Sequence, residues 1–475
     1  MFYNNNNMKK AQFGMIGLGT MGRNLVLNMA DHGISVCGYD RNPDQLKRLL
    51  EEGKDKPVQV ENTMAAFVES LEVPRKVMML VPAGKITDAA ILEVSAFLQP
   101  GDILIDGGNS HFRDTDARIA RLAPTGIHFT GMGVSGGEDG ARLGPSMMPG
   151  GNILGYAKLK NIFEKITAQS DEGACVTFIG KGSAGHYTKM VHNGIEYAIM
   201  QLISEAYAAL KNVAGCTNKE MQEIFDQWNK GPLQSFLMEI TAKIFLQKDD
   251  INTDRMLVDV ILDKAAQKGT GMWTSTSAME LHIPVPTIDE AVAARDVSIF
   301  KQERELINSY TGKDLPATIE DKTTFVQQLH DAIYFGILTS YVQGLHLLQE
   351  ASLAYKYEIN LAEVTRIWKG GCIIRSLMLN DIRKAYLKND LLKNLLMDKE
   401  FYDLLLQHRK ATTSVLKTIM DYKTGMPALS SALHYVDMFS TARLSSNLIQ
   451  AQRDFFGAHT YERIDKTGSF HTEWI

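Results

Sequence analysis

The stretch Gly17-Leu18-Gly19-Thr20-Met21-Gly22 follows the apolar run Gln12–Ile16 and precedes a helical pattern that begins at Arg23. In this order the first glycine permits a tight turn, the second lets the backbone approach a pyrophosphate, and the third lets the helix lie close to the strand. Amides at the start of the helix then face the phosphates. Asp40 ends a second apolar run, Ser35–Tyr39, eighteen residues beyond the last of these glycines. The order predicts a dinucleotide-binding βαβ unit rather than an ordinary glycine-rich turn.

Two neighbouring charges point to different cofactors. Asp40 is placed to accept hydrogen bonds from a ribose 2′-hydroxyl and to repel a 2′-phosphate, which favours NAD. Arg41 is able instead to stack on adenine or to pair with that phosphate, which favours NADP. The residues alone leave NAD and NADP open. We also assign Val81, at the end of a later apolar run, and Asn109 to the cofactor site.

The first 182 residues alternate short apolar runs with helical patterns, which predicts a Rossmann-type α/β domain with buried parallel strands. The remaining predicted strands are Val77–Val81, Ile103–Ile105, His128–Thr130 and Val176–Ile179. After Gly185 strand patterns nearly vanish, so we predict an all-helical substrate and dimerisation domain over 183–441. The aromatic-rich residues 442–475 form too short a segment to bury their own side chains, and we expect a tail that packs on a partner subunit.

A weak internal repeat lies in the helical part. Trp228-Asn229-Lys230-Gly231 resembles Trp368-Lys369-Gly370-Gly371, 140 residues later, and Leu237-Met238 matches Leu377-Met378 at the same offset. Duplication of a helical unit explains the matches, but so few matches also arise by chance. The sequence leaves both interpretations open.

Composition excludes several classes of function. The 475 residues are 45% hydrophobic with a net charge of −5, which gives no reason to expect nucleic acid or an anionic membrane as a partner. The four cysteines are far apart and form no CxxC pair, so we expect a reducing compartment and no metal site. Met1–Asn7 lacks a basic region and a hydrophobic segment, and no apolar run is long enough to span a membrane. We therefore predict a cytoplasmic protein.

The helical part opens on an unusual set of polar residues, Lys189, His192, Asn193, Glu196 and Tyr197. Their spacing of i, i+3, i+4, i+7 and i+8 predicts that all five share one face of a helix. A solvated face with a Lys–Glu ion pair is the alternative, but Lys189 and Glu196 are too far apart for an ordinary i,i+4 pair. The apolar residues between them indicate a buried helix, in which charged side chains are costly unless a site uses them. We interpret Lys189 and Glu196 as catalytic acid–base groups.

Two glycine-rich segments follow predicted strands. They are Asp106-Gly107-Gly108-Asn109-Ser110 and Gly133-Val134-Ser135-Gly136-Gly137. Paired glycines expose backbone amides, and ligands of α/β proteins bind at the carboxyl ends of strands. Each segment alone is equally explained as a tight turn. Together, and beside the polar helix face, they predict a site for an anionic substrate.

These motifs together resemble those of 6-phosphogluconate dehydrogenase (decarboxylating), and the resemblance extends from about residue 11 to about residue 465. Besides the segments above, it rests on Gln267-Lys268-Gly269-Thr270-Gly271 and on Gln452-Arg453-Asp454-Phe455-Phe456-Gly457-Ala458-His459. These last two are the most specific, because related β-hydroxyacid dehydrogenases lack the second helical half. A dehydrogenase of that kind, which oxidises without decarboxylation, would predict a much shorter chain without the tail. A redox sensor without activity would not need Lys189 and Glu196.

The resemblance implies oxidative decarboxylation of 6-phosphogluconate to ribulose 5-phosphate in the pentose phosphate pathway and in gluconate utilisation. It implies that Lys189 is the general base and acid on the C3 hydroxyl and that Glu196 protonates C1 of the enediol. It assigns the carboxylate and hydroxyls of the substrate to Asn109, Ser135, Gly136, Gly137, His192 and Asn193, and the phosphate to Tyr197, Lys268, Thr270 and Arg295. It also implies a homodimer in which Arg453 and His459 reach the site of the other subunit.

One departure from the family concerns the cofactor. NADP-using members typically end the second strand with Asn-Arg-Thr or Asn-Arg-Ser, whereas this chain has Asp40-Arg41-Asn42. An acid in place of a neutral Asn weakens the binding of a 2′-phosphate. The family default is NADP, and the departure predicts NAD preference or dual use.

Overall fold

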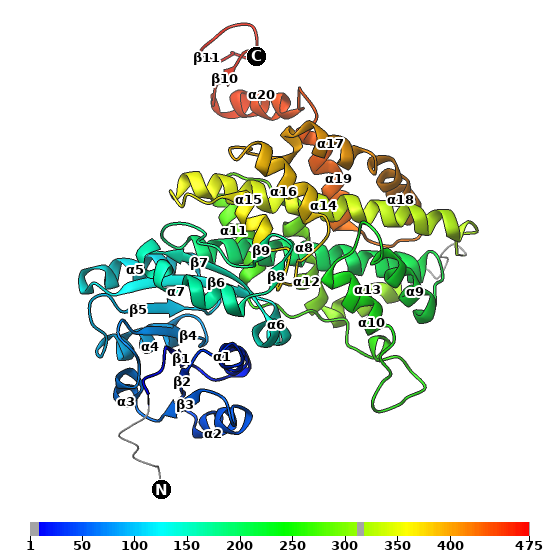
Figure 1. Cartoon of the computed structure of the whole chain (residues 1–475). Coiled ribbons are helices and arrows are strands. Elements are labelled where there is room, and N and C mark those ends of the chain that lie inside the picture. The colour runs from blue at the N-terminus through cyan, green and yellow to red at the C-terminus, as the bar shows by residue number, and fades with distance from the viewer. Residues whose placement is uncertain (1–8, 311–317, 475) are drawn as a thin grey trace.

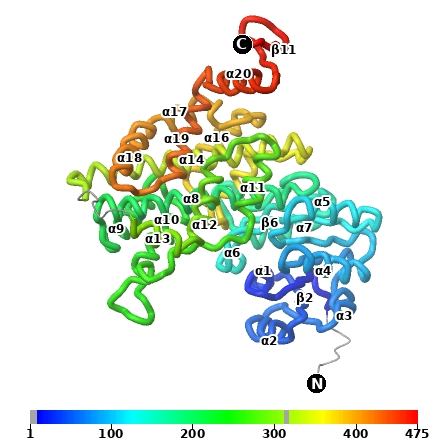
Figure 2. Tube along the Cα trace, turned by 180° about the vertical axis from the view of Figure 1, so that it is seen from behind, coloured from blue at the N-terminus to red at the C-terminus, as the bar shows by residue number. Residues whose placement is uncertain are grey.

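The computed structural model describes residues 9–310 and 318–474 (Figure 1). The chain forms an α/β domain, then a large helical part, and then a tail that projects from the opposite end of the molecule in both Figures 1 and 2. The predicted fold class, a Rossmann-type domain followed by a large helical domain, is confirmed. The leader Met1–Asn7 lies outside the described residues, and the division at residues 182 and 441 stays a prediction.

A seven-stranded sheet in the order β3-β2-β1-β4-β5-β6-β7 organises the α/β domain. Its strands are β1 (Phe13–Ile16), β2 (Val36–Tyr39), β3 (Val58–Glu61), β4 (Lys76–Met79), β5 (Ile103–Asp106), β6 (His128–Ser135) and β7 (Ser146–Gly151). Neighbouring strands are parallel, except that β7 is antiparallel to β6. The strand order reverses between β1 and β4, and α/β proteins bind nucleotides at such a switch point.

Helices connect the strands and cover both faces of the sheet. They are α1 (Thr20–Asp31), α2 (Pro43–Glu52), α3 (Met64–Glu69), α4 (Lys85–Ser95), α5 (Phe112–Leu122), α6 (Gly137–Leu143) and α7 (Ile153–Ile166). Phe13 and Met15 of β1 pack on one face with Leu25 and Phe163, whereas Ile16 packs on the other face. Burial on both faces explains why these strands read as continuous apolar runs.

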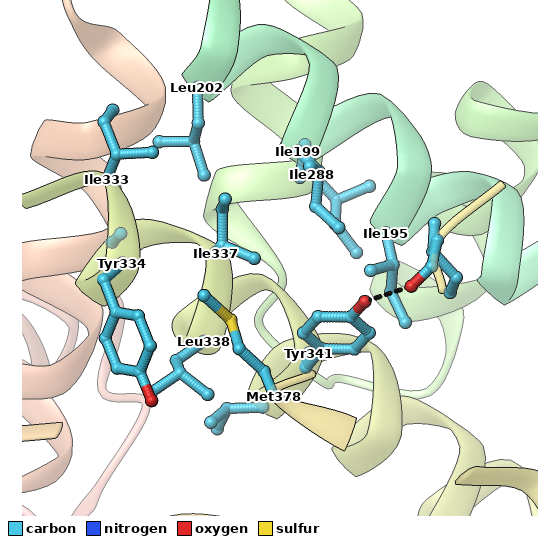
Figure 3. Close-up of a cluster of buried hydrophobic side chains, with 14 of the residues drawn as sticks. Ile195, Ile199, Leu202, Ile288, Ile333, Tyr334, Ile337, Leu338, Tyr341 and Met378 are labelled. Carbon is cyan, nitrogen blue, oxygen red and sulfur yellow. Dashed lines mark hydrogen bonds between the residues drawn. The ribbon is translucent and has the colours of Figure 1, made fainter. Parts of the chain in front are cut away.

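The helical part continues the chain from residue 184. Its helices are α8 (Ala184–Asn212), α9 (Asn218–Trp228), α10 (Phe236–Ile244), α11 (Thr270–Glu280), α12 (Pro286–Ile299), α13 (Lys301–Tyr310), α14 (Lys322–Ala354), α15 (Leu361–Ile367), α16 (Leu379–Lys388), α17 (Lys399–Leu406), α18 (Arg409–Asp421), α19 (Pro427–Phe439) and, in the tail, α20 (Ser446–Gly457). Short strand pairs are β8 (Gln169–Ser170) with β9 (Gly173–Ala174) and β10 (Tyr461–Glu462) with β11 (Ser469–Phe470). The long helices α8 and α14 pack against each other around an apolar core, in which Figure 3 shows Ile199, Leu202 and Ile337.

The internal repeat acquires structural support. Trp228 ends α9 and Trp368 follows α15, and each of these helices comes after one of the two long helices. The segments that follow the tryptophans pair with each other: the Phe236 amide donates to the Arg375 carbonyl at 3.2 Å, and the Leu377 amide donates to the Gln234 carbonyl at 2.9 Å. Matched order and mutual antiparallel pairing favour duplication over chance.

The structure removes one predicted strand, adds two that were not predicted and lengthens another. Val176–Ile179 makes only isolated bridges beside β7, because the Val176 carbonyl accepts from Arg366 of the helical part. The edge strand β3 and the antiparallel β7 are absent from the prediction. Strand β7 contains Pro149 followed by Gly150 and Gly151, a composition that argues against a strand.

Strand β6 also continues five residues beyond the predicted end at Thr130. The extension contains Gly131 and Gly133, and glycine is normally depleted in strands. Here helix α8 lies directly against the strand: a Cβ atom at Gly131 would collide with the ring of His186, and one at Gly133 would collide with the side chain of Lys189. The glycines therefore permit close backbone approach rather than a turn.

Candidate active site

Helix α8 carries the predicted polar face along the carboxyl end of β6. The helix is continuous through residues 189–197, and Lys189, His192 and Asn193 are buried, with the Lys189 residue only 7% exposed. Close approach of Gly133 fixes Lys189 next to Ser135, the last residue of β6. The structure thus brings the helix face and one of the two predicted glycine-rich segments together.

Hydrogen bonds connect these side chains into a buried network. The Lys189 ammonium Nζ donates to Asn193 Oδ1 at 2.7 Å and lies 3.4 Å from His192 Nδ1. His192 Nε2 lies 3.2 Å from Ser135 Oγ, and Asn193 Nδ2 donates to Thr270 Oγ1 at 3.1 Å. Each polar group therefore has a partner that restricts its orientation, which is what a catalytic group requires before substrate binds.

Burial controls the protonation of the network. Desolvation lowers the pKa of Lys189, and the nearby Glu196 carboxylate opposes that decrease. Desolvation also holds the pKa of His192 well below its ordinary value, so the imidazole is neutral and has one donor and one acceptor nitrogen. Burial raises the pKa of Glu196. All three shifts favour the uncharged forms of these side chains.

Glu196 lies two helical turns beyond Lys189 and is more accessible. Its side chain is 21% exposed, and its Oε2 lies 3.8 Å from His192 Nδ1. Two turns correspond to roughly 11 Å along the helix axis. Lys189 and Glu196 therefore face the same site at two separate points and are suited to act on different atoms of one substrate.

Basic and aromatic groups continue the site past Glu196. The Arg295 guanidinium lies 3.4 Å from the centre of the Tyr197 ring, a cation–π contact that orients it. Thr270 is the first residue of the eleven-residue α11, whose N-terminus has no side-chain cap and no acid in its first turn. The exposed Lys268 precedes it by two residues. Free helix amides with Arg and Lys nearby form an arrangement suited to a phosphate.

The loop of Asn109 is positioned by buried charges that the sequence did not reveal. Arg118 donates to Asp106 Oδ2 at 3.0 Å and to Ser110 Oγ at 2.9 Å, so both ends of the loop are fixed while Asn109 stays exposed. His186 Nδ1 lies 2.7 Å from Thr115 Oγ1 next to this loop. Arg118, Thr115 and His186 lie outside the glycine-rich motif, which is why sequence reasoning missed them.

The second helical unit also contributes to the site. Gly136 and Gly137 have φ of 121° and 64°, and a Cβ atom at Gly136 would lie 2.5 Å from the Gly371 carbonyl oxygen. The Ile373 amide approaches Ser135 Oγ at 3.5 Å, and Trp368 meets the His192 ring edge-on at 5.5 Å. The repeated Trp-x-x-Gly pattern was the one sequence feature that pointed to this segment.

Arg453 and His459 do not join the site within one chain. Both residues are exposed, and the tail that carries them lies away from α8 (Figures 1 and 2). The tail is nevertheless ordered by itself, since the buried Asp454 accepts hydrogen bonds from the Thr460 amide and from the Trp474 indole, each at 2.9 Å. The two residues are thus held on a preformed unit that projects from the molecule.

A cavity of about 350 Å³ lies at the switch point of the sheet. It is lined by Ile16, Gly17, Gly19, Tyr39, Asp40, Arg41, Asn42, Gln45, Met64, Leu80, Val81, Pro82, Ile86, Ala90 and Glu93. Five predicted cofactor residues, Gly17, Gly19, Asp40, Arg41 and Val81, therefore meet in one cavity. Leu18 and Gly22 are buried beside it, Thr20 and Met21 begin α1, and Asn109 lies on the loop after β5.

The glycine positions fit a dinucleotide. Gly17 has φ of 90°, and a Cβ atom at Gly22 would collide with the Gly17 carbonyl oxygen. A Cβ atom at Gly19 would meet nothing within 4 Å, which leaves open space in front of the helix. The N-terminus of α1 has no side-chain cap and no acidic residue in its first turn. Its amides are free to bind a pyrophosphate.

Asp40 has a role that the sequence did not show. Its Oδ2 accepts from the Leu18 amide at 2.7 Å, and its Oδ1 accepts from the Asn42 amide at 2.9 Å. The carboxylate predicted to contact the ribose therefore also holds the glycine loop. Arg41 forms an ion pair with Glu93, its Nη2 lying 2.7 Å from Glu93 Oε2.

Within residues 9–310 and 318–474, no group of three His, Cys, Asp or Glu side chains is arranged to hold a metal ion. Among the helices of these same ranges, none has the length and apolar character needed to cross a membrane.

Comparison with known proteins agrees with this geometry. Residues 12–180 match the family model described as the NAD binding domain of 6-phosphogluconate dehydrogenase, and residues 185–474 match the model of its C-terminal domain. The chain belongs to the 6-phosphogluconate dehydrogenase family. The predicted family is thereby confirmed.

Relatives and a solved structure match over almost the whole chain. A Bacillus subtilis protein named 6-phosphogluconate dehydrogenase, NADP(+)-dependent, decarboxylating is 47% identical over 98% of this chain and 100% of its own length. A Synechococcus elongatus 6-phosphogluconate dehydrogenase, decarboxylating, is 46% identical with the same coverage. The Plasmodium falciparum 6-phosphogluconate dehydrogenase, solved with NADP+ and with 6-phosphogluconate, superposes with a TM-score of 0.93 at 42% identity, covering 98% of this chain and 100% of that one.

Proposed function

We propose that the chain catalyses the oxidative decarboxylation of 6-phosphogluconate to ribulose 5-phosphate and carbon dioxide with a nicotinamide dinucleotide. One observation carries the proposal: a buried Lys189, held by Asn193 beside a neutral His192, lies at the carboxyl edge of a dinucleotide-binding sheet. The polar face continues through Glu196 to Arg295 and to the uncapped N-terminus of α11. A carboxylate, hydroxyls and a terminal phosphate on one small substrate would match these groups in order.

Lys189 acts first as a general base. Burial lowers its pKa and so favours the neutral amine, the form that takes the proton of the C3 hydroxyl. A bound nicotinamide ring supplies the acceptor for the C3 hydride. Asn193 and His192 hold the amine, so its lone pair is oriented before the proton moves.

Lys189 then stabilises the second stage in its protonated form. Loss of carbon dioxide from the 3-keto acid moves an electron pair onto the C3 oxygen, and the ammonium beside that oxygen offsets the developing negative charge. Glu196, with its pKa raised by burial, retains a proton that it delivers to C1 of the enediol. C1 of the enediol is the former C2 and is bonded to C3, so in this proposal the Lys189 and Glu196 side chains converge on neighbouring carbons from two points along α8.

Substrate orientation is the proposed task of the surrounding residues. Asn109, Ser135, Gly136, Gly137, His192 and Asn193 bind the carboxylate and hydroxyls, and Tyr197, Lys268, Thr270 and Arg295 bind the phosphate. Uncapped amides and a stacked guanidinium at the α11 end support the second assignment, since a phosphate dianion is usually held by several donors.

The test is a product balance. Purified protein with 6-phosphogluconate and either cofactor should give reduced nicotinamide and carbon dioxide in equal amounts, and Lys189→Ala should abolish both. Lys181→Ala, which removes an exposed lysine paired with Glu358 just before α8, is the matched control and should keep turnover. Near-normal turnover of Lys189→Ala would overturn the role of that lysine, and oxidation without carbon dioxide would indicate a non-decarboxylating enzyme.

We further propose that NAD is preferred or used alongside NADP. The cavity at the switch point has Asp40 at the end of β2 where a ribose 2′-hydroxyl would lie, and an acid there repels a 2′-phosphate. The Bacillus subtilis relative, which is named as NADP(+)-dependent, sets the opposite expectation. Steady-state kinetics decide between the two, and a kcat/KM for NADP more than about tenfold above that for NAD would refute the proposal.

A homodimer is proposed from the tail. Leu448, Ile449, Phe455 and Phe456 are 55–71% exposed on the projecting α20, which is an unusual density of bare apolar side chains. We infer that they pack on a second copy and bring Arg453 and His459 to its site. A chain ending at Thr441 should lose both dimer mass in light scattering and activity. Arg453→Ala should stay dimeric while losing substrate affinity, and an active monomer would contradict the shared site.

A reducing, cytoplasmic location is proposed on the usage of cysteine. Cys37, Cys175, Cys216 and Cys372 are all buried and unpaired thiols. Such thiols are typical of reducing compartments. Fractionation of the native cells, followed by detection of the protein, tests this location.

A further inference from the structure

Three charged residues line the cofactor cavity, and they stand together at its rim. Asp40, Arg41 and Glu93 carry formal charges of −1, +1 and −1, and every other lining residue is uncharged. The rim therefore has a net charge of −1, next to the position where the second ribose of a dinucleotide binds at the end of β2. Attraction of a 2′-phosphate to this rim depends on Arg41.

Arg41 is engaged by Glu93 across the mouth of the cavity. Its guanidinium lies 2.7 Å from Glu93 Oε2, and the side chains are 72% and 33% exposed. The carboxylate raises the pKa of Arg41 through this hydrogen bond. Glu93 comes from α4, which follows β4, so the pair joins the loops after β2 and β4 on either side of the switch point.

We propose that Glu93 is a specificity-determining residue, which holds Arg41 in an ion pair and thereby disfavours cofactors with a 2′-phosphate. A 2′-phosphate needs the guanidinium and has to draw it away from Glu93, with the carboxylate left close to the new anion. A 2′-hydroxyl needs no guanidinium and leaves the pair intact. The inference rests on the proposed use of a nicotinamide dinucleotide, and it names the residue that sets the choice between its two forms.

Substitution of Glu93 tests cofactor specificity without disturbing the glycine loop, whereas substitution of Asp40 does not. Asp40 accepts two backbone amides, those of Leu18 and Asn42, so its replacement disturbs the glycine loop that both cofactors use. The hydrogen bond of Glu93 goes to the Arg41 side chain instead. Substitution of Glu93 therefore changes the availability of Arg41 while the glycine loop keeps its supports.

The experiment measures dissociation constants of NADP and NAD by calorimetry on the full chain, together with kcat/KM for each. Glu93→Gln should raise the preference ratio of NADP over NAD by about two- to fivefold, the size expected for one exposed charge pair. Glu51→Gln removes an exposed charge of the neighbouring helix α2 that pairs only weakly with Lys47 at 3.8 Å, and it should leave the ratio unchanged.

A double-mutant cycle tests the role of Arg41. The gain from Glu93→Gln should disappear in an Arg41→Ala background, because there is then no guanidinium to release. An unchanged ratio in Glu93→Gln, or an equal gain without Arg41, would overturn the inference. Because binding is measured without turnover, a failure of the proposed reaction would show as absent activity with 6-phosphogluconate while the binding ratio still shifts.

Discussion

The long helices α8 and α14 lie side by side in one core, yet only α8 carries a site. The repeat offset of 140 residues relates the polar face of α8 to α14 position by position. Lys189, His192, Asn193, Glu196 and Tyr197 correspond to Leu329, Ala332, Ile333, Gly336 and Ile337. All five residues of α14 are buried, and Figure 3 shows Ile333 and Ile337 inside the apolar cluster between the helices.

The difference teaches how to separate functional from structural polar groups in a buried helix. The buried hydroxyls of α14, such as Thr339 and Ser340, each donate to a carbonyl of their own helix at 2.9 Å. They need no partner elsewhere and cost little. Lys189 instead depends on Asn193 and is forced toward its neutral form by burial. A buried ionisable group with side-chain partners indicates chemistry, whereas a hydroxyl satisfied by its own helix indicates packing.

The largest effect is expected on the polar helix. Glu196→Gln should lower kcat by about 10²–10⁴-fold, because the enediol loses its acid. The same change removes a carboxylate that raises the pKa of Lys189, so the acid limb of kcat/KM should shift to lower pH. A pH–rate profile of the residual activity measures the shift. An unmoved limb would mean that the limb does not report Lys189.

The corresponding apolar position should affect stability instead. Leu329→Ala should lower the free energy of unfolding by about 2–5 kcal/mol, since a fully buried leucine is truncated in a packed core. Urea unfolding measures the loss, and kcat per folded molecule should stay within about twofold of the wild type. A loss of activity like that of Lys189→Ala would break the proposed contrast between the two helices.

Near its end α8 carries another buried ionisable residue, Glu205, which corresponds to Leu345 of α14. Burial raises the pKa of Glu205 from its ordinary 4.5 to about 7, although its carboxylate accepts from the Ala428 and Leu429 amides at the start of α19. The folded state thus holds this proton more tightly than the unfolded chain. Stability from this group is full below about pH 4.5 and is lost as pH rises through about 7.

Glu205→Gln should remove this pH dependence of the free energy of unfolding, which amounts to about 3 kcal/mol over the full titration. Unfolding free energies from urea titrations between pH 5 and 8 would show a decline in the wild type that is smaller in the variant. Parallel declines in the two proteins would contradict the assignment.

The smallest effect is expected at a satisfied hydroxyl of α14. Thr339→Val removes a hydrogen bond to the helix's own Phe335 carbonyl, which remains bonded within the helix. The free energy of unfolding should change by less than about 1.5 kcal/mol, as is typical of one neutral hydrogen bond. Thermal unfolding measures this change. A loss of stability comparable with that of Leu329→Ala would show that the hydroxyl makes a larger contribution than one neutral hydrogen bond.

Local spacing made much of this architecture predictable. The glycine-rich turn after β1 and the face that includes Lys189 and Glu196 each follow from residues within ten positions of one another. Features that depend on distant segments were not predictable. The sequence pattern ends strand β6 before Gly131, because the role of its glycines depends on their contact with α8. The Arg41–Glu93 pair joins residues 52 positions apart, which no periodic pattern relates.

The tail is a second example of how far sequence patterns can predict the site. Its aromatic residues predicted a segment that needs an outside surface, and α20 does project from the molecule with Phe455 and Phe456 exposed. The assignment of Arg453 and His459 to a site came from family resemblance rather than from their spacing. Within a single chain Arg453 bonds to Gln450 and His459 packs on Phe456, and both contacts lie inside the tail.

Gly131 of β6 and Gly150 of β7 lie against Gly185 of α8, and we call this contact between the α/β domain and the helical part the glycine seam. It has a consequence for protein engineering. A Cβ atom at Gly185 would collide with the carbonyls of Met148 and Gly131, and one at Gly150 would collide with the Gly185 backbone. Backbone atoms contact backbone atoms at the glycine seam, so there are no side chains that could move to accommodate a larger residue. A chimera that combines the nucleotide half of one family member with the helical half of another will therefore assemble only if both parents keep glycine at these positions. An attempt to change cofactor preference by exchanging the whole nucleotide-binding domain therefore depends first on whether the glycine seam still fits, and only then on the cofactor contacts.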